Sequence, residues 1–110
     1  MRSDRERLLD ILDAIARVER YATRGRRAFE NDELIQAWIV QHLQIIGEAA
    51  SKISDEMQSA HPEIPWANIV AMRNIIVHDY FGVDRDEVWS TVEFDLPSLK
   101  RQVEGVTSGK

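Results

Sequence analysis

The stretch Met72-Arg73-Asn74-Ile75-Ile76-Val77-His78-Asp79-Tyr80 closes a helical pattern that begins near Pro65 and Trp66. At 100° per residue, one side of this predicted helix carries Trp66, Ile69, Val70, Arg73, Ile76, Val77 and Tyr80. Arg73 therefore lies inside an apolar stripe, where a core would normally place a leucine. Because a guanidinium keeps its proton, burying it without a partner is costly. We expect an anionic group or a second chain to face Arg73.

His78 points away from Arg73 on an ideal helix. It follows Arg73 by five residues, which is about 140° around the axis, whereas Tyr80 lies only about 20° from Arg73. The side chains can converge if the helix unwinds near His78, as Gly82 would permit. They can also converge if two chains face each other across a two-fold axis. We expect both arrangements to operate together.

Length and composition predict a single folded domain. A chain of 110 residues is long enough for a core and near the size at which helical domains often dimerise. It has no cysteine, which excludes disulfides and thiolate metal sites. No apolar run is long enough to span a membrane, and Met1 is followed by charged residues, not by a signal peptide's apolar region. We therefore expect a cytoplasmic protein.

The first half of the chain predicts two helices. Ser3 and Glu6 form a capping box, so the first helix begins there and ends around residues 22–25, followed by a loop through residues 26–29. Asp32 can cap the second helix, which we expect to run from Glu33 to about residue 57. Gly47 in its middle predicts close packing against another helix.

The second half predicts two more helices and completes the fold. Pro65 suits the first position of a helix that runs to about residue 77, and residues 84–87 can open the last helix. Pro97 must kink that helix, because proline lacks the N–H and crowds the preceding turn. Strand alternation is absent from the sequence. We predict an all-α, four-helix up-and-down bundle over residues 1–104, with a frayed tail over residues 105–110.

Charge is unevenly distributed along the chain. The net charge of −5 argues mildly against a general nucleic-acid binder. Residues 1–30, however, carry eight arginines against six acids, and four of these arginines recur at spacings of three and four: Arg17, Arg20, Arg24 and Arg27. This stripe fits either a solvated helix face or a strip that follows RNA phosphates.

Several kinds of site can be set aside. The sequence contains no Gly-rich phosphate loop and no serine nucleophile motif. His42, His61 and His78 lack the spacing of metal ligands, so we expect no metal and no cofactor. His42 falls on the apolar stripe of the second helix, which favours a core or interface histidine.

The remaining polar group suits RNA cleavage without a metal ion. His78 can accept the 2′-hydroxyl proton or donate a proton to the leaving 5′-oxygen. Arg73 can hold the scissile phosphate and stabilise the charge of the transition state, while Asn74 and Asp79 can orient these two residues. The alternative is a purely structural pair between Arg73 and Asp79 or another carboxylate, with His78 as a helix cap.

A wider pattern favours the catalytic alternative. The residues Pro65-Trp66, Ile69, Met72-Arg73-Asn74, His78 and Tyr80-Phe81-Gly82-Val83-Asp84, taken with Ile45-Ile46-Gly47-Glu48-Ala49-Ala50, resemble the HepT family of the HEPN superfamily. The resemblance covers essentially the whole chain, through Trp89 and Asp95-Leu96-Pro97. It implies a helical bundle that forms a homodimer, with the two Arg-x-x-x-x-His sites facing one cleft.

The resemblance also implies a biological role. HepT proteins are toxin ribonucleases of toxin–antitoxin pairs, and their antitoxin is a small nucleotidyltransferase, MntA, that transfers AMP to the motif tyrosine. Carried over, Arg73 and His78 become the catalytic pair, Asn74 the polar residue after the arginine, and Tyr80 the modified tyrosine. Two rivals remain: a non-catalytic HEPN module that binds the nucleotidyltransferase or a nucleotide, and a plain dimerisation bundle.

Overall fold

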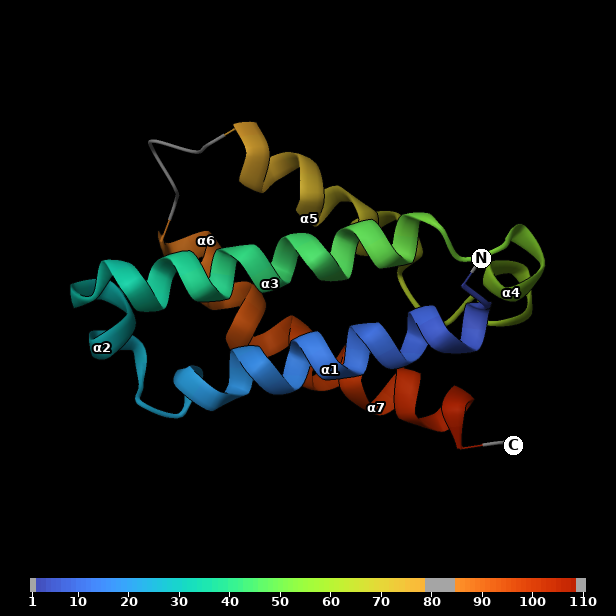
Figure 1. The fold of residues 1–110 in the computed structure, drawn as a ribbon, viewed down its shortest axis with the longest axis horizontal. Coiled ribbons are helices and arrows are strands. Elements are labelled where there is room, and N and C mark those ends of the chain that lie inside the picture. The colour runs from blue at the N-terminus through green and yellow to red at the C-terminus, as the bar shows by residue number, and fades with distance from the viewer. Residues whose placement is uncertain (1, 79–84, 109–110) are drawn as a thin grey trace.

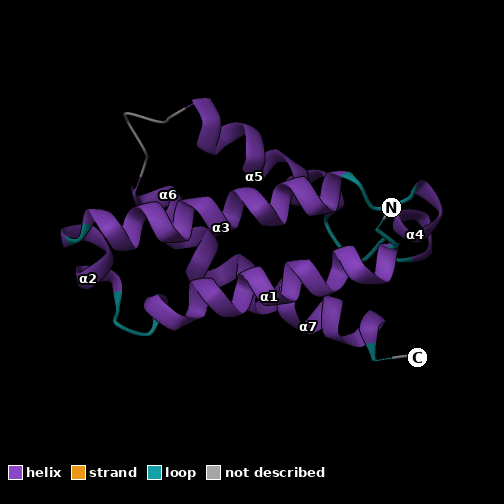
Figure 2. Cartoon of the chain, viewed as in Figure 1, coloured by secondary structure: helices purple, strands orange, loops and turns teal. Residues whose placement is uncertain are grey.

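The computed structural model describes residues 2–78 and 85–108, and all of its regular elements are helical (Figures 1 and 2). In chain order they are α1 (Asp4–Ala22), α2 (Arg26–Asn31), α3 (Glu33–Ser51), α4 (Asp55–Ala60), α5 (Trp66–His78), α6 (Arg85–Ser90), the π-helical turn η1 (Thr91–Asp95) and α7 (Leu96–Thr107). The predicted all-α class is confirmed for the described residues, none of which forms a strand. None of the helices found there is long and apolar enough to cross a membrane.

The helices α1 and α3 form the centre of the bundle. They run antiparallel, with α5 packed along α3 and α7 along α1 (Figure 1). Successive long helices alternate in direction, as in an up-and-down bundle. The core between them consists of fully buried side chains, among them Leu8, Ile11, Ile15, Val18, Ile39, Leu43, Ile46, Ile64, Ile69, Leu96 and Val103.

The short helix α2 replaces the loop predicted over residues 26–29. Phe29 is only 1% exposed, and its ring centroid lies 5.4 Å from that of Trp89. Arg26 also forms an i,i+4 ion pair with Glu30 at 2.9 Å. Burial of the Phe29 ring, which contributes on the order of 2 kcal/mol, favours a helical turn here over a solvated loop.

The predicted second helix is broken into α3 and α4. Asp32 caps α3 as expected, since its side chain accepts a hydrogen bond from the Leu34 N–H. The break follows from Ser54, whose hydroxyl caps α4 by accepting a hydrogen bond from the Met57 N–H. Asp4 fixes this turn, because its carboxylate accepts hydrogen bonds from the Ser54 N–H at 3.0 Å and the Ser54 hydroxyl at 2.6 Å. These bonds lower the pKa of Asp4.

The predicted last helix is present as α6, η1 and α7, with the irregularity next to Pro97. The Leu96 N–H donates to the Thr91 carbonyl, a π-type bond that accommodates a proline without an N–H. The tail predicted to fray from residue 105 is instead helical to Thr107. Val106 packs against the core, and the Thr107 carbonyl accepts a hydrogen bond from Arg5 at 2.7 Å, which explains the extension.

Gly47 provides the close contact between α3 and α5. A Cβ atom at this position would lie 2.9 Å from the Arg73 backbone nitrogen, 3.0 Å from the Arg73 Cβ and 3.2 Å from the Ile69 carbonyl oxygen. These neighbours include helix backbone, which has no room to move aside. The predicted role of Gly47 in helix packing is therefore confirmed.

We predict that Gly47→Ala lowers the free energy of unfolding by about 1–2 kcal/mol. Alanine gains up to about 1 kcal/mol of helix propensity, but pushing α5 away from α3 costs more. Gly105→Ala is the matched control, since nothing lies within 4 Å of a Cβ there, and it should leave stability unchanged or raised by up to about 1 kcal/mol. Urea unfolding of both variants measures the difference, and equal stabilisation by the two substitutions would contradict the packing argument.

Candidate active site around Arg73

Arg73 lies on the face of α5 that packs against α3. Its side chain is 34% exposed, and its Nη1 donates to Glu48 Oε1 at 2.8 Å and to the Ser51 hydroxyl oxygen at 3.2 Å. The sequence predicted an anionic group or a second chain opposite this guanidinium. The structure confirms the first alternative, and the anionic group is Glu48.

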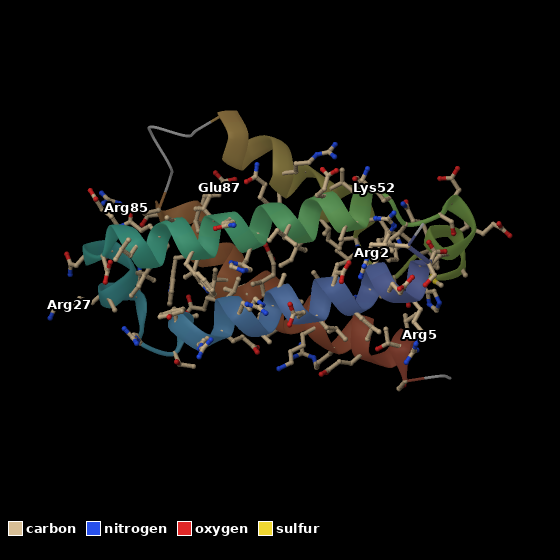
Figure 3. All side chains as sticks on the ribbon, in the orientation of Figure 1. Arg2, Arg5, Arg27, Lys52, Arg85 and Glu87 are labelled. Carbon is tan, nitrogen blue, oxygen red and sulfur yellow. The ribbon has the colours of Figure 1, made fainter. Side chains whose placement is uncertain are left out.

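The partners of Arg73 occupy one side of the end of α3. Glu48, Ser51 and Lys52 are spaced i, i+3 and i+4, so their side chains are neighbours on a helix. The Ser51 hydroxyl donates to the Glu48 carbonyl oxygen at 2.6 Å, and Lys52 Nζ lies 3.6 Å from Glu48 Oε2 (Lys52 is labelled in Figure 3). Among the described residues, Nε and Nη2 of Arg73 have no partner, so they remain available for another acceptor.

The ion pair also sets the protonation of Glu48. The hydrogen bond from Arg73 is the main cause that lowers the pKa of Glu48, and Lys52 adds to it. A lowered carboxyl pKa keeps the group ionised at neutral pH. Its contribution to stability is present above the pKa of an unfolded glutamate and is lost as the pH falls through the lowered value.

The other predicted site residues fall near the edge of the described structure. His78 is the last residue of α5, close to the predicted helix end at residue 77. The side chains of Asn74 and His78 lie outside the described part, as do Asp79 and Tyr80 entirely. The roles of these four residues therefore stay predictions.

The arginine stripe predicted from the sequence is not continuous in the structure. The helix α1 ends at Ala22, so Arg24 and Arg27 do not extend the face that carries Arg17 and Arg20. Arg17 pairs with the carboxylate four residues before it at 2.9 Å, Arg24 lies 5.0 Å above the centroid of the Tyr21 ring, and Arg27 belongs to α2 (Figure 3).

His42 is a core histidine, as the sequence indicated. It is 6% exposed, and its Nδ1 lies 2.7 Å from the Trp38 carbonyl oxygen. No group of three or more histidines and carboxylates suited to a metal ion occurs in the described parts of the chain.

A cleft of about 570 Å³ lies on another side of α5, between it and the α6–η1–α7 segment. Its charged lining residues are Glu63, Glu87 and Asp95, all of them acidic. A phosphate backbone would meet repulsion here. The cleft is therefore a poor path for a nucleic acid.

Sequence reasoning missed Glu48 and Ser51. The available signal was Gly47: a glycine that lets α5 approach α3 also brings the side chains next to it on α3 within reach of α5. Periodicity alone does not reveal this, because it does not say which helix lies opposite.

Comparison with known proteins identifies the family of the chain. The family described as ribonuclease HepT-like matches residues 11–106, which include the whole stretch from Arg73 to Tyr80. "Probable ribonuclease HepT" of Thermococcus cleftensis is 40% identical over 106 residues, 94% of each chain. "Putative RNase MJ1380" of Methanocaldococcus jannaschii is 38% identical over 76 residues, 69% of this chain and 70% of that one. No solved structure matches. The chain belongs to the ribonuclease HepT-like family.

Proposed function

We propose that this protein is an endoribonuclease that cleaves RNA without a metal ion, with Arg73 and His78 as its catalytic pair. The observation that carries this proposal is the orientation of Arg73. Glu48 and Ser51 accept hydrogen bonds from its Nη1, the one guanidinium nitrogen with a partner among the described residues. His78, five residues later, ends the same helix. Membership of the ribonuclease HepT-like family, with relatives named as RNases, supports the same activity.

In the proposed reaction the 2′-oxygen of the RNA attacks the adjacent phosphorus, and the bond to the 5′-oxygen of the next nucleotide breaks. One histidine accepts the proton of the 2′-hydroxyl, and a second donates a proton to the leaving 5′-oxygen. Arg73 donates from Nε and Nη2 to the phosphate oxygens and stabilises the added negative charge. Asn74 and Asp79 support the pair by hydrogen bonding.

Replacing either catalytic residue should abolish most RNA cleavage. We expect Arg73→Ala and His78→Ala each to slow cleavage of a fluorescent RNA roughly 100- to 1,000-fold, because charge stabilisation and proton transfer are each worth that much. Circular dichroism should show a retained helical fold. Arg101→Ala and His61→Ala are matched controls, and cleavage should persist in EDTA. Wild-type rates in the His78→Ala protein would rule out this mechanism.

We also propose that the active form is a two-fold homodimer. Apolar side chains of α5 are not all covered by this chain: Trp66 and Ile69 are buried, whereas Val70 and Met72 are only partly buried. Apolar helix residues are normally covered by a neighbouring element, yet α5 packs chiefly against α3. A second copy would cover it and supply the second histidine that the reaction requires.

The dimer interface should bury more than about 1,000 Å². Light scattering at micromolar concentration should therefore give twice the mass of the chain, which is 12.7 kDa. Mixing wild-type protein with an excess of His78→Ala protein tests whether the site is shared, since mixed dimers hold only one of the two histidines and should lose most of their activity. A stable monomer that still cleaves RNA would contradict both the dimer and the composite site.

We propose that this ribonuclease is the cytoplasmic toxin of a toxin–antitoxin pair, and that an MntA-type nucleotidyltransferase silences it. The Tyr80 hydroxyl oxygen would attack the α-phosphorus of ATP, with loss of its proton and release of pyrophosphate. The attached AMP would bring a negative charge and a bulky nucleoside close to Arg73. Arg73 could then pair with this phosphate, and RNA would meet repulsion and steric exclusion.

Incubation with the nucleotidyltransferase, Mg²⁺ and ATP should add AMP-sized mass increments and stop RNA cleavage. The chain contains two tyrosines, so Tyr21→Phe is the matched control for Tyr80→Phe. The Tyr21 ring packs edge-on against Trp38 at 5.5 Å, away from the predicted site. We expect Tyr80→Phe to take up no AMP and to stay active. Modification of Tyr80→Phe at the wild-type level would show that another residue is the acceptor.

The alternative function is a non-catalytic HEPN module that binds the nucleotidyltransferase or a nucleotide. Nε and Nη2 of Arg73, which have no partner among the described residues, would serve a bound nucleotide phosphate equally well. Binding of AMP or of the partner without any RNA cleavage by the wild-type dimer would favour this alternative over the ribonuclease.

A further inference from the structure

A second pocket, of about 300 Å³, opens between α1 and α3. Its polar lining includes Arg7, Asp10 and Arg17 from α1, with His42, Glu48 and Lys52 from the α3 side. Glu48 belongs to both places, because its Oε1 also accepts the 2.8 Å hydrogen bond from Arg73. The pocket therefore begins one side chain away from the proposed catalytic arginine.

His42 presents an unused nitrogen to this pocket. A carbonyl oxygen can only accept, so Nδ1 carries the proton that is donated to Trp38. In the neutral ring Nε2 is then an acceptor, and it has no partner among the described residues. None of the polar side-chain atoms described is both sealed from solvent and unpaired. Nε2 of this buried histidine must therefore reach solvent, and the opening that His42 lines is the pocket.

The charges around the pocket favour an anionic ligand. Each lining carboxylate already has a cationic partner: Asp10 pairs with Arg2 at 2.7 Å, Asp13 with Arg17 at 2.9 Å, and Glu48 with Arg73 at 2.8 Å. The Arg7 side chain forms no hydrogen bond or close ion pair within the described part of the chain, although its charge helps to lower the pKa of Asp4 and Glu6. The lining itself holds three cations, Arg7, Arg17 and Lys52, against these three paired carboxylates.

This balance of charge contrasts with the cleft beside α5, whose charged lining residues are all acidic. A phosphodiester strand that reaches Arg73 therefore meets less repulsion along the α1–α3 side than along that cleft.

We propose that the pocket between α1 and α3 is a nucleotide subsite, which holds the RNA residue next to the phosphate bound at Arg73. This inference rests on the proposed ribonuclease function. The base or ribose enters the pocket against Ile45 and donates an N–H or O–H to His42 Nε2. The phosphate of that nucleotide lies at the mouth, where Arg7 and Lys52 donate to it. A volume of about 300 Å³ is at the lower end of small-ligand pockets, which suits a single nucleotide and not a duplex.

The test measures RNA binding separately from cleavage. In His78→Ala protein, an unmodified RNA hexanucleotide should shift the NMR signals of His42, Ile45 and Lys52, and AMP should shift the same set more weakly. Inorganic phosphate should affect Lys52 and leave the His42 ring signals in place. If phosphate alone reproduces the hexanucleotide's shifts, or if the hexanucleotide leaves the pocket signals unmoved, the subsite is ruled out.

Substitutions provide the second arm. His42→Phe keeps an aromatic ring against Trp38 but removes Nε2, together with the Nδ1 hydrogen bond to the Trp38 carbonyl, and Arg7→Ala removes the cation without a close partner. Each should weaken hexanucleotide binding about 5- to 10-fold, the value of one lost hydrogen bond to a charged or buried partner. Arg5→Ala is the matched control, because Arg5 lies on the α7 side of α1 and donates to Thr107 (Figure 3). If Arg7→Ala and Arg5→Ala both bind the hexanucleotide as tightly as the unsubstituted His78→Ala protein, the proposal is overturned. This outcome is decisive even if His42→Phe fails to fold.

The two proposals can fail separately. If the pocket signals move and Arg7→Ala weakens binding while wild-type protein cleaves no RNA, the subsite stands and the ribonuclease function falls. If cleavage depends on Arg73 and His78 but RNA shifts signals elsewhere, the ribonuclease function stands and the subsite falls.

Discussion

The contact between α3 and α5 at Gly47 is the constraint on which the candidate site depends. With no Cβ at residue 47, the Arg73 backbone comes close enough for Glu48 and Ser51 to reach its guanidinium at 2.8 and 3.2 Å. The ion pair itself is about a third to a half exposed, so solvent screens it and it adds little to stability. Burial of a single side chain such as Ile69 contributes more, on the order of 2 kcal/mol. The apolar contacts hold the helices together, and the ion pair serves chiefly to orient Arg73.

This arrangement gives α3 two different neighbours along its length. One face contacts α1 and contributes His42 to the pocket between α1 and α3, and another contacts α5 and contributes Glu48 to Arg73. Beyond α5 lies the acid-lined cleft. Acidic and basic side chains are balanced in the pocket, whereas the charged residues of the cleft are all acidic. Net charge alone does not describe either site, because binding depends on the local field.

Local signals predicted a large part of this structure, and the misses share one physical cause. The Ser3 capping box, the Asp32 cap and the tight packing at Gly47 all follow from neighbours in sequence or from the size of one residue. The helix α2 depends instead on Phe29 meeting Trp89, and the break after α3 depends on Asp4 binding Ser54, 50 residues away. Glu48 was missed for the same reason: its role is set by the helix opposite, which periodicity does not identify.

The ion pair between Glu48 and Arg73 also explains how a partly buried arginine can be stable and still keep the capacity to bind a phosphate. An isolated guanidinium at this depth would be costly to desolvate, and a fully neutralised one would attract an anion weakly. Here one carboxylate is shared between two cations, since Lys52 lies 3.6 Å from the Glu48 oxygen that Arg73 does not use. The three side chains together retain one positive charge, and Nε and Nη2 of Arg73 have no partner among the described residues. In the proposed reaction a phosphate would therefore bind without displacing Glu48, and the guanidinium would keep its orientation.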